Sequence, residues 1–156
     1  MSDSAGVVLE AAMDIKLINM PFGHLAMPSL ALTQLKAILD QEFGDALDVE
    51  ILYLNMDIAQ TEGMSALYDH VLSTGGFMTG VGDWLFRQVA FPDAPDNSDA
   101  YLNRYYFDES PASRDVRAYV GGPRRGLCSM LDALVERYRL DQADIVGFTS
   151  LFAQTV

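Results

Sequence analysis

The chain has 156 residues, half of them hydrophobic, and its 22 acidic and 10 basic side chains give a formal net charge of −12. This length and composition suit one domain with a substantial core. The negative charge argues against a nucleic-acid partner, because affinity for nucleic acids depends on neutralising phosphates. No stretch approaches the ~20 consecutive apolar residues of a membrane span, so no membrane association is expected.

The single cysteine, Cys128, excludes an intrachain disulfide and any metal cluster built from cysteines of this chain. The N-terminus lacks the basic region and the long apolar stretch of a signal peptide. We therefore expect a cytoplasmic protein in which residues 1–13 are loosely ordered and residues 14–156 form the domain. Cys128 lies next to the apolar stripe of a predicted helix, which favours a core position over a nucleophilic role.

A strand, a helix and a second strand are predicted near the N-terminus. Ile15–Asn19 is apolar on both faces, as a central parallel strand should be. Met27–Ser29 opens a helix that ends at Gly44, a plausible C-cap. The predicted buried stripe of this helix consists of Leu32, Leu35, Leu39 and Phe43. Val49–Asn55 is the second strand, and the three elements together form a right-handed βαβ unit.

The middle of the chain is predicted to be a long helical insertion, over residues of about 57–120. Within it, the spacing of Val81, Trp84 and Val89 indicates a short helix, with Asp83 as its N-cap and Trp84 as a core anchor. Residues 121–123, Gly-Gly-Pro, then break the chain before a strongly amphipathic helix.

Asp144–Thr149 is the third predicted strand, and few residues follow it. The fold class is therefore α/β: an incomplete parallel sheet of about three strands, with the helical insertion between the second and third. A sheet of three strands is small, and its third strand is an apolar edge unless something pairs with it. We expect the chain to represent part of a larger domain or to complete its sheet with a partner.

Two loops follow predicted strands and form the candidate ligand site, because open parallel sheets bind ligands at the carboxyl ends of their strands. The first loop consists of Asn19, Met20, Pro21, Phe22 and Gly23. From the second segment we take Gly147, Thr149, Ser150, Leu151 and Gln154 as candidate contacts. Glycine permits close approach of a ligand, and hydroxyl groups can donate hydrogen bonds to it. Ordinary strand ends without a ligand remain an alternative, and no catalytic residue or metal ligand is predicted.

Several segments in order resemble one enzyme family. They are Leu17–Phe22, Pro28–Leu30, Leu52–Asn55, Gly82–Phe86 and Asp144–Gln154. Together they resemble the N-terminal, cobalamin-binding-like region of the cobalamin-dependent radical S-adenosylmethionine enzymes, many of them C-methyltransferases, that modify ribosomal peptides. The resemblance covers almost the whole chain from Ile15 onward. It implies a flavodoxin-like (Rossmann-like) sheet that binds cobalamin.

The resemblance also implies parts that these residues do not contain. In the family a radical domain follows, whose three cysteines hold an iron–sulfur cluster that works with S-adenosylmethionine on a peptide substrate. With Cys128 alone, this chain is not expected to perform radical chemistry by itself. Pro21 stands where the general cobalamin-binding motif has its ligating histidine, and His24 is not expected to reach the cobalt. Any cobalamin would then lack a protein histidine ligand.

Two other interpretations stay open. The chain could be a non-catalytic interaction module or a subunit of a split enzyme that pairs through its third-strand edge, with a radical domain or a second copy, and binds no cofactor. A weaker alternative is a flavodoxin-like domain for another nucleotide. Cofactor binding depends on the site at the strand ends, whereas the interaction module depends on the exposed edge of the third strand.

Overall fold

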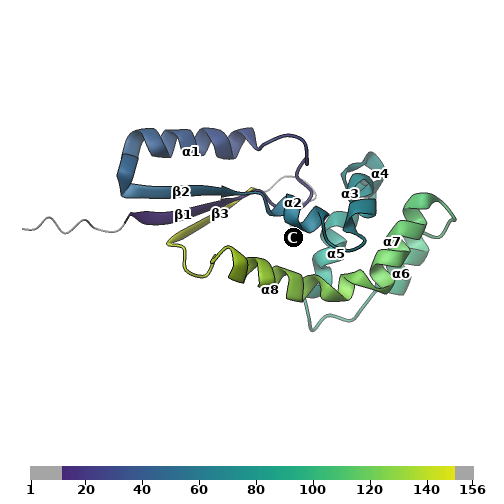
Figure 1. The fold of residues 1–156 in the computed structure, drawn as a ribbon. Helices are drawn as coiled ribbons and strands as arrows, with labels where there is room; N and C mark the ends of the chain where they lie inside the picture. The colour runs from purple at the N-terminus through teal and green to yellow at the C-terminus, as the bar shows by residue number, and fades with distance from the viewer. Residues whose placement is uncertain (1–11, 150–156) are drawn as a thin grey trace, which may run out of the picture.

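The computed structural model describes residues 12–149, and within them the fold is mixed α/β with eight α-helices and one parallel sheet. The three strands are β1 (Met13–Ile18), β2 (Leu47–Leu52) and β3 (Ile145–Phe148), in the order β2-β1-β3. Figure 1 shows the sheet and α1 at one end of the molecule and most other helices at the opposite end. The predicted parallel sheet of three strands is confirmed.

One face of the sheet is covered by α1 (Leu30–Phe43). Ile15 and Leu17 of β1, with Val49 of β2, form a small core against Leu32 of this helix. The helix begins after Ser29, whose hydroxyl caps the backbone N–H of Leu32, and ends at the predicted C-cap.

The buried stripe predicted for α1 is partly wrong. Leu32 is buried and Leu39 partly so, but Leu35 and Phe43 are 42% and 55% exposed. A single helix lying on a sheet buries only the narrow strip that faces the strands, so the flanking apolar positions stay in solvent.

The opposite face of β1 is polar near its start, so the prediction of a strand apolar on both faces is wrong. Lys16 is mostly buried there, and its ammonium lies 3.0 Å from Asp14 Oδ1 and 2.9 Å from Glu50 Oε2. The hydrogen bonds that Lys16 donates to these carboxylates, above all to Glu50, raise the pKa of Lys16. The ion pairs let a charged side chain occupy this face without being left unpaired.

The predicted helical insertion between the second and third strands is confirmed. It consists of α2 (Leu54–Ala59), α3 (Met64–Leu72), α4 (Thr74–Thr79), α5 (Val81–Ala90), α6 (Ser98–Tyr105) and α7 (Pro111–Gly121). The 3₁₀ turns η1 (Gly44–Ala46) and η2 (Pro123–Gly126) precede β2 and α8 (Leu127–Arg137) respectively. The second strand was predicted too far along the chain: β2 begins at Leu47 rather than Val49 and ends at Leu52, and Asn55 belongs to α2.

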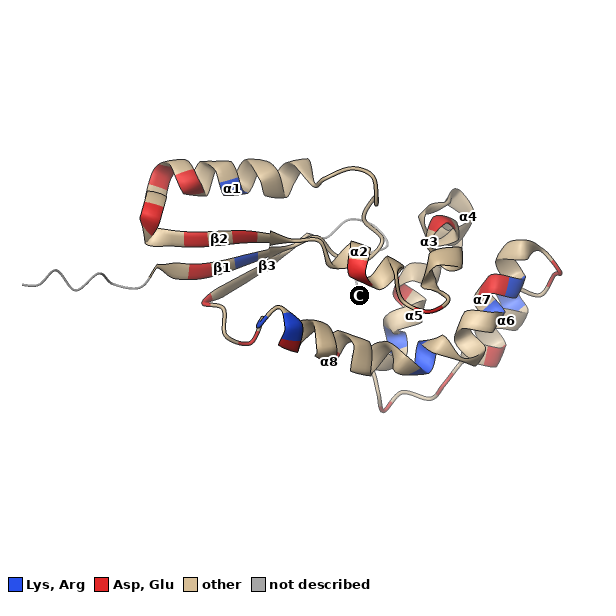
Figure 2. Ribbon diagram, in the orientation of Figure 1, with Lys and Arg blue, Asp and Glu red and all other residues tan. Residues whose placement is uncertain are grey.

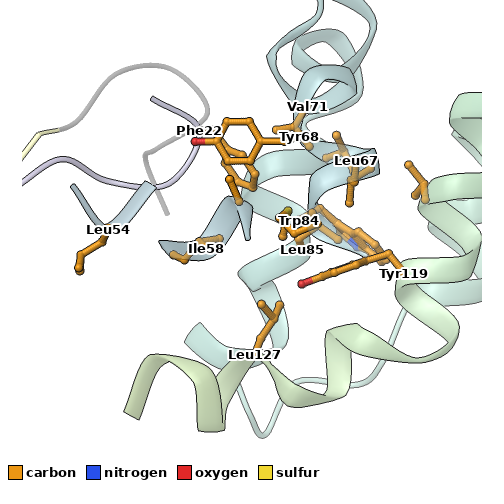
Figure 3. Packing of buried hydrophobic residues seen from close by; sticks show 14 of the residues in the cluster. Phe22, Leu54, Ile58, Leu67, Tyr68, Val71, Trp84, Leu85, Tyr119 and Leu127 are labelled. Atoms are coloured by element: carbon orange, nitrogen blue, oxygen red, sulfur yellow. The ribbon is translucent and has the colours of Figure 1, made fainter. Parts of the chain in front are cut away.

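The main core lies among the insertion helices (Figure 3). Ile18 of β1 and Leu52 of β2 belong to the same cluster and connect it to the sheet. Trp84 is a core anchor as predicted: it is 7% exposed and stacks on Tyr101 with ring centroids 3.9 Å apart. Asp83 is not the N-cap, because Gly80 occupies that position and α5 already begins at Val81.

The joint between α3 and α4 depends on Gly76. A Cβ atom at this position would lie 2.2 Å from the carbonyl oxygen of His70, so no other residue fits without moving the backbone.

Cys128 is exposed, which contradicts its predicted core position; it sits on the flank of α8 rather than on its buried stripe. In residues 12–149 no helix combines the length and apolar character needed to cross a membrane.

Candidate ligand site at the carboxyl edge of the sheet

The chain leaves β1 and enters β3 on opposite faces of the sheet (Figure 1). After β1 it runs through α1, which packs on one face, and it reaches β3 from α8, whose Leu134 belongs to the core on the other face. β1 and β3 are neighbours in the sheet. Connections that diverge from adjacent parallel strands leave a crevice at the carboxyl ends of those strands, where open α/β sheets bind ligands.

The two loops predicted to form the site meet at this edge. The hydroxyl oxygen of Thr149 accepts a hydrogen bond from the backbone N–H of Met20 at 3.1 Å and donates to Asn19 Oδ1 at 3.4 Å. The backbone N–H of Thr149 donates to Ile18 at 2.9 Å. Asn19 is 6% exposed, so its buried side chain has a structural role at this edge of the sheet.

Two residues from the helical insertion hold the first loop from the other side. The Tyr68 hydroxyl donates to the carbonyl oxygen of Gly23 at 2.9 Å, and Asn55 Nδ2 donates to the same oxygen at 3.4 Å. The backbone N–H of Asn55 also donates to Asn19 at 3.2 Å. Burial raises the pKa of Tyr68 to about 12, so its hydroxyl remains a donor at neutral pH.

Sequence reasoning did not identify Asn55 or Tyr68 as parts of the site. The position of Asn55 at the end of the predicted second strand was a signal, because the carboxyl ends of parallel strands share one edge. Helical periodicity marks Tyr68 as a core residue, yet it does not indicate which group its hydroxyl contacts.

The backbone of the loop is held in an unusual conformation. Phe22 has a φ of 64°, in the left-handed region that a bulky residue rarely adopts. Its ring is 5% exposed and packs against Tyr68 and Phe86, with centroids 5.5 and 6.0 Å away. A Cβ atom at Gly23 would lie 3.0 Å from Asn19 Nδ2, so glycine allows the loop to close onto the Asn19 side chain.

An apolar pocket of about 370 Å³ opens beside this loop. Its walls come from the first loop, from α2, α5 and α8, from the segment after α8, and from the end of β3. They are Met20, Pro21, Phe22, Leu54, Ile58, Phe86, Val89, Ala90, Leu131, Leu134, Val135, Leu140 and Phe148. Its volume lies within the range of small-molecule sites. An apolar pocket of this kind suits the burial of a flat or aliphatic group.

Only some of the predicted site residues line the pocket. Met20, Pro21 and Phe22 line the pocket, as described above. Gly147 lies within β3, and a Cβ atom at this position would lie 3.1 Å from the side chain of Leu17. Its role in the structure is close packing against β1. Ser150, Leu151 and Gln154 lie outside the described residues.

His24, which directly follows the first loop, has a local structural role. His24 is exposed, and its Nδ1 accepts a hydrogen bond from the backbone N–H of Ala26 at 3.1 Å. It does not line the pocket, whereas Pro21 does and is buried.

The site can thus bury an apolar group beside a rigid loop, with backbone and hydroxyl groups at its edge. Among residues 12–149 no group of three or more histidine, cysteine or acidic side chains is arranged to hold a metal ion. Comparisons of the chain with protein-family models, with curated proteins and with solved structures find no match.

Proposed function

We propose that this chain is the cobalamin-binding part of a radical S-adenosylmethionine enzyme that methylates carbon atoms of a peptide. One observation carries the proposal: an apolar pocket lies at the carboxyl ends of β1 and β3, beside the loop that follows β1. The strand order β2-β1-β3 agrees with the first three strands of a flavodoxin-like sheet, in which the ligand lies between β1 and β3. The resemblance of five sequence segments supplies the identity of the ligand.

The residues present fit part of a cobalamin. A pocket of about 370 Å³ is too small for a whole corrinoid but suits its flat, apolar benzimidazole base. In this proposal Met20, Pro21 and Phe22 contact the cofactor directly, and Asn19 and Thr149 hold the loop. Gly23 and Gly147 allow the close packing, and the predicted contacts of Ser150, Leu151 and Gln154 extend the same edge.

When bound, cobalamin supplies a methyl group carried on cobalt, and this domain positions the cofactor. The proposal assigns no protein histidine to the cobalt, because His24 is occupied with Ala26 and Pro21 replaces the usual ligand. The iron–sulfur cluster, S-adenosylmethionine and the peptide substrate belong to a radical domain outside these 156 residues, which contain one cysteine. The proposal places the enzyme in the cytoplasm, with neither nucleic acid nor membrane as a partner.

A cobalamin titration with a pocket-filling variant tests the proposal. Hydroxocobalamin is added to the purified chain, free ligand is removed, and the visible absorbance of the protein fraction is measured. Ala90→Trp fills the pocket from its rim and should weaken retention at least tenfold, while Ala37→Trp, on the exposed side of α1, should leave it unchanged. No retention by the wild-type chain at millimolar ligand would overturn the proposal.

Two further measurements sharpen the assignment. Cobinamide lacks the benzimidazole base, so its weaker binding should be insensitive to Ala90→Trp. The spectrum of retained cobalamin should show no histidine ligand and should be unchanged in His24→Ala. If His24→Ala alters the spectrum, the histidine-free part of the proposal is wrong even when the cofactor is retained.

A second candidate function is an interaction module that binds no cofactor. It is favoured by β3, which pairs on one side only within the described residues and whose Ile145 is 47% exposed. Such an edge can pair with a second copy or with a strand of the radical domain. Sedimentation analysis tests self-pairing: a concentration-dependent dimer that Ile145→Lys disrupts supports it, and a monodisperse monomer contradicts it.

A further inference from the structure

A second cavity, of about 690 Å³, lies among the insertion helices. It is bounded by α5, by the connection from α5 to α6, and by α6, α7, η2 and the start of α8. Val89 of α5 separates it from the apolar pocket at the sheet edge, because this side chain lines both. Unlike that pocket, the second cavity has charged walls.

The basic and the acidic residues of its lining come from different elements. Arg117, Arg124 and Arg125 come from α7 and η2, and Asp96 and Asp99 come from the α5–α6 connection and the first turn of α6. All eight arginines of this acidic chain lie between residues 87 and 139, and Figure 2 shows basic residues on the helices at this end of the molecule. We call α7 and η2 the basic wall of the cavity, and the α5–α6 connection with the first turn of α6 its acidic wall. The two walls are in contact, because Arg124 Nη1 donates a hydrogen bond to Ser98 Oγ at 2.9 Å.

The basic wall is held rigidly. Arg124 donates from Nε to the carbonyl oxygen of Leu85 and from Nη2 to that of Trp84, both at 3.0 Å. Its guanidinium lies 4.0 Å from the centre of the Trp84 ring. These contacts fix the position of Arg124, so its positive charge is held in place at the wall of the cavity. Arg117 is fixed in the same way, by hydrogen bonds to Tyr106 and Leu102.

One basic and one acidic side chain at the rim of the cavity have no ion-pair or hydrogen-bond partner among the described residues. Arg125 and Asp99 are both exposed, and neither side chain takes part in an ion pair or hydrogen bond within the described part of the chain. Asp96, in contrast, accepts hydrogen bonds from the backbone and hydroxyl of Ser98. Leu102 and Val120 provide apolar surface between the charged walls.

We infer that this cavity binds a small zwitterion with an apolar body, the chemistry of a free aliphatic amino acid. The carboxylate of such a ligand suits Arg125 and its neighbours, and its ammonium group suits Asp99. A phosphate dianion fits less well, because two aspartates line the same cavity as the arginines. The inference does not rest on cobalamin binding, since the two cavities have different linings and different probes.

The test uses the single tryptophan of the chain. Trp84 stacks against Arg124 at the cavity wall, so its fluorescence should respond to a ligand there. L-Leucine, leucinamide (ammonium only) and N-acetyl-leucine (carboxylate only) are titrated into the full chain, with calorimetry on the same samples in case the fluorescence is silent. Leucine should bind saturably, and each analogue should bind roughly tenfold more weakly, because one charge-assisted hydrogen bond is lost.

Variants of the exposed rim residues locate the site without disturbing the core. Arg125→Ala should weaken leucine and N-acetyl-leucine but not leucinamide, and Asp99→Asn should weaken leucine and leucinamide but not N-acetyl-leucine. Arg114→Ala, an exposed arginine of α7 outside the cavity lining, should bind all three as the wild type does. The inference is overturned if neither method detects leucine binding, or if the rim variants and Arg114→Ala behave alike.

Discussion

Removing the Tyr68 hydroxyl is the sharpest test of how the loop after β1 is held. Tyr68 is 1% exposed, and its hydroxyl donates to the Gly23 carbonyl at 2.9 Å. Tyr68→Phe keeps the ring that packs against Phe22 and deletes only this donor. The carbonyl then keeps only the longer hydrogen bond from Asn55, at 3.4 Å. We expect a loss of about 1 to 3 kcal/mol in the free energy of unfolding, the cost of leaving a partly buried acceptor poorly satisfied.

Urea denaturation measures this loss. The midpoint should fall in Tyr68→Phe while the slope stays constant, since the change removes one contact and no surface. Tyr105→Phe is the matched control, because Tyr105 is 40% exposed and should change stability by less than about 0.5 kcal/mol. Amide exchange at Met20 and Gly23 should also accelerate in Tyr68→Phe alone. Equal stability of the two variants, with unchanged exchange, would refute the idea that Tyr68 holds the loop.

Three other outcomes are expected. Gly76→Ala should prevent folding or lower the free energy of unfolding by more than about 3 kcal/mol, because a Cβ atom would meet a carbonyl oxygen of α3 at 2.2 Å. Gly121→Ala is the control, because a Cβ atom there meets nothing within 4 Å, and thermal denaturation should show it to be near neutral. Asp57→Ala should cost about 1.5 to 3 kcal/mol in urea, because Asp57 of α2 accepts a hydrogen bond at 2.7 Å from the hydroxyl of Tyr138, the residue after α8; a neutral result would show that this link is dispensable. Since burial raises the pKa of Tyr68 from 10.0 to about 12, stability should be complete below pH 10 and should fall toward pH 12, and Tyr68→Phe should show a shallower fall.

The arrangement of the strands and the meeting of the two loops could be predicted from sequence. Ile15, Leu17 and Ile18 mark the first strand and Ile145–Phe148 the third, and parallel strands bring their carboxyl ends to one edge. What sequence could not provide was the support from the insertion. Tyr68 is 45 residues from Gly23 along the chain, and no local pattern links a helical tyrosine to a distant carbonyl.

The wrong predictions share a physical cause. Periodicity shows which residues lie on one face of a helix or strand, but not whether another element covers that face. Leu35 and Phe43 follow the helical period and are nonetheless exposed, because α1 meets only the sheet. Lys16 was included in an apolar strand, yet two carboxylates accommodate it on the face opposite α1.

The hydrogen bonds that the insertion makes to Gly23 set a limit on any attempt to reduce this protein to a minimal sheet. Excision of the residues between β2 and α8 would remove both donors to that carbonyl and, with α2 and α5, two walls of the pocket. The strained Phe22 would lose the aromatic rings that hold it and could relax to negative φ. A designer who grafts this loop and its pocket onto another scaffold therefore has to transfer the insertion helices as well.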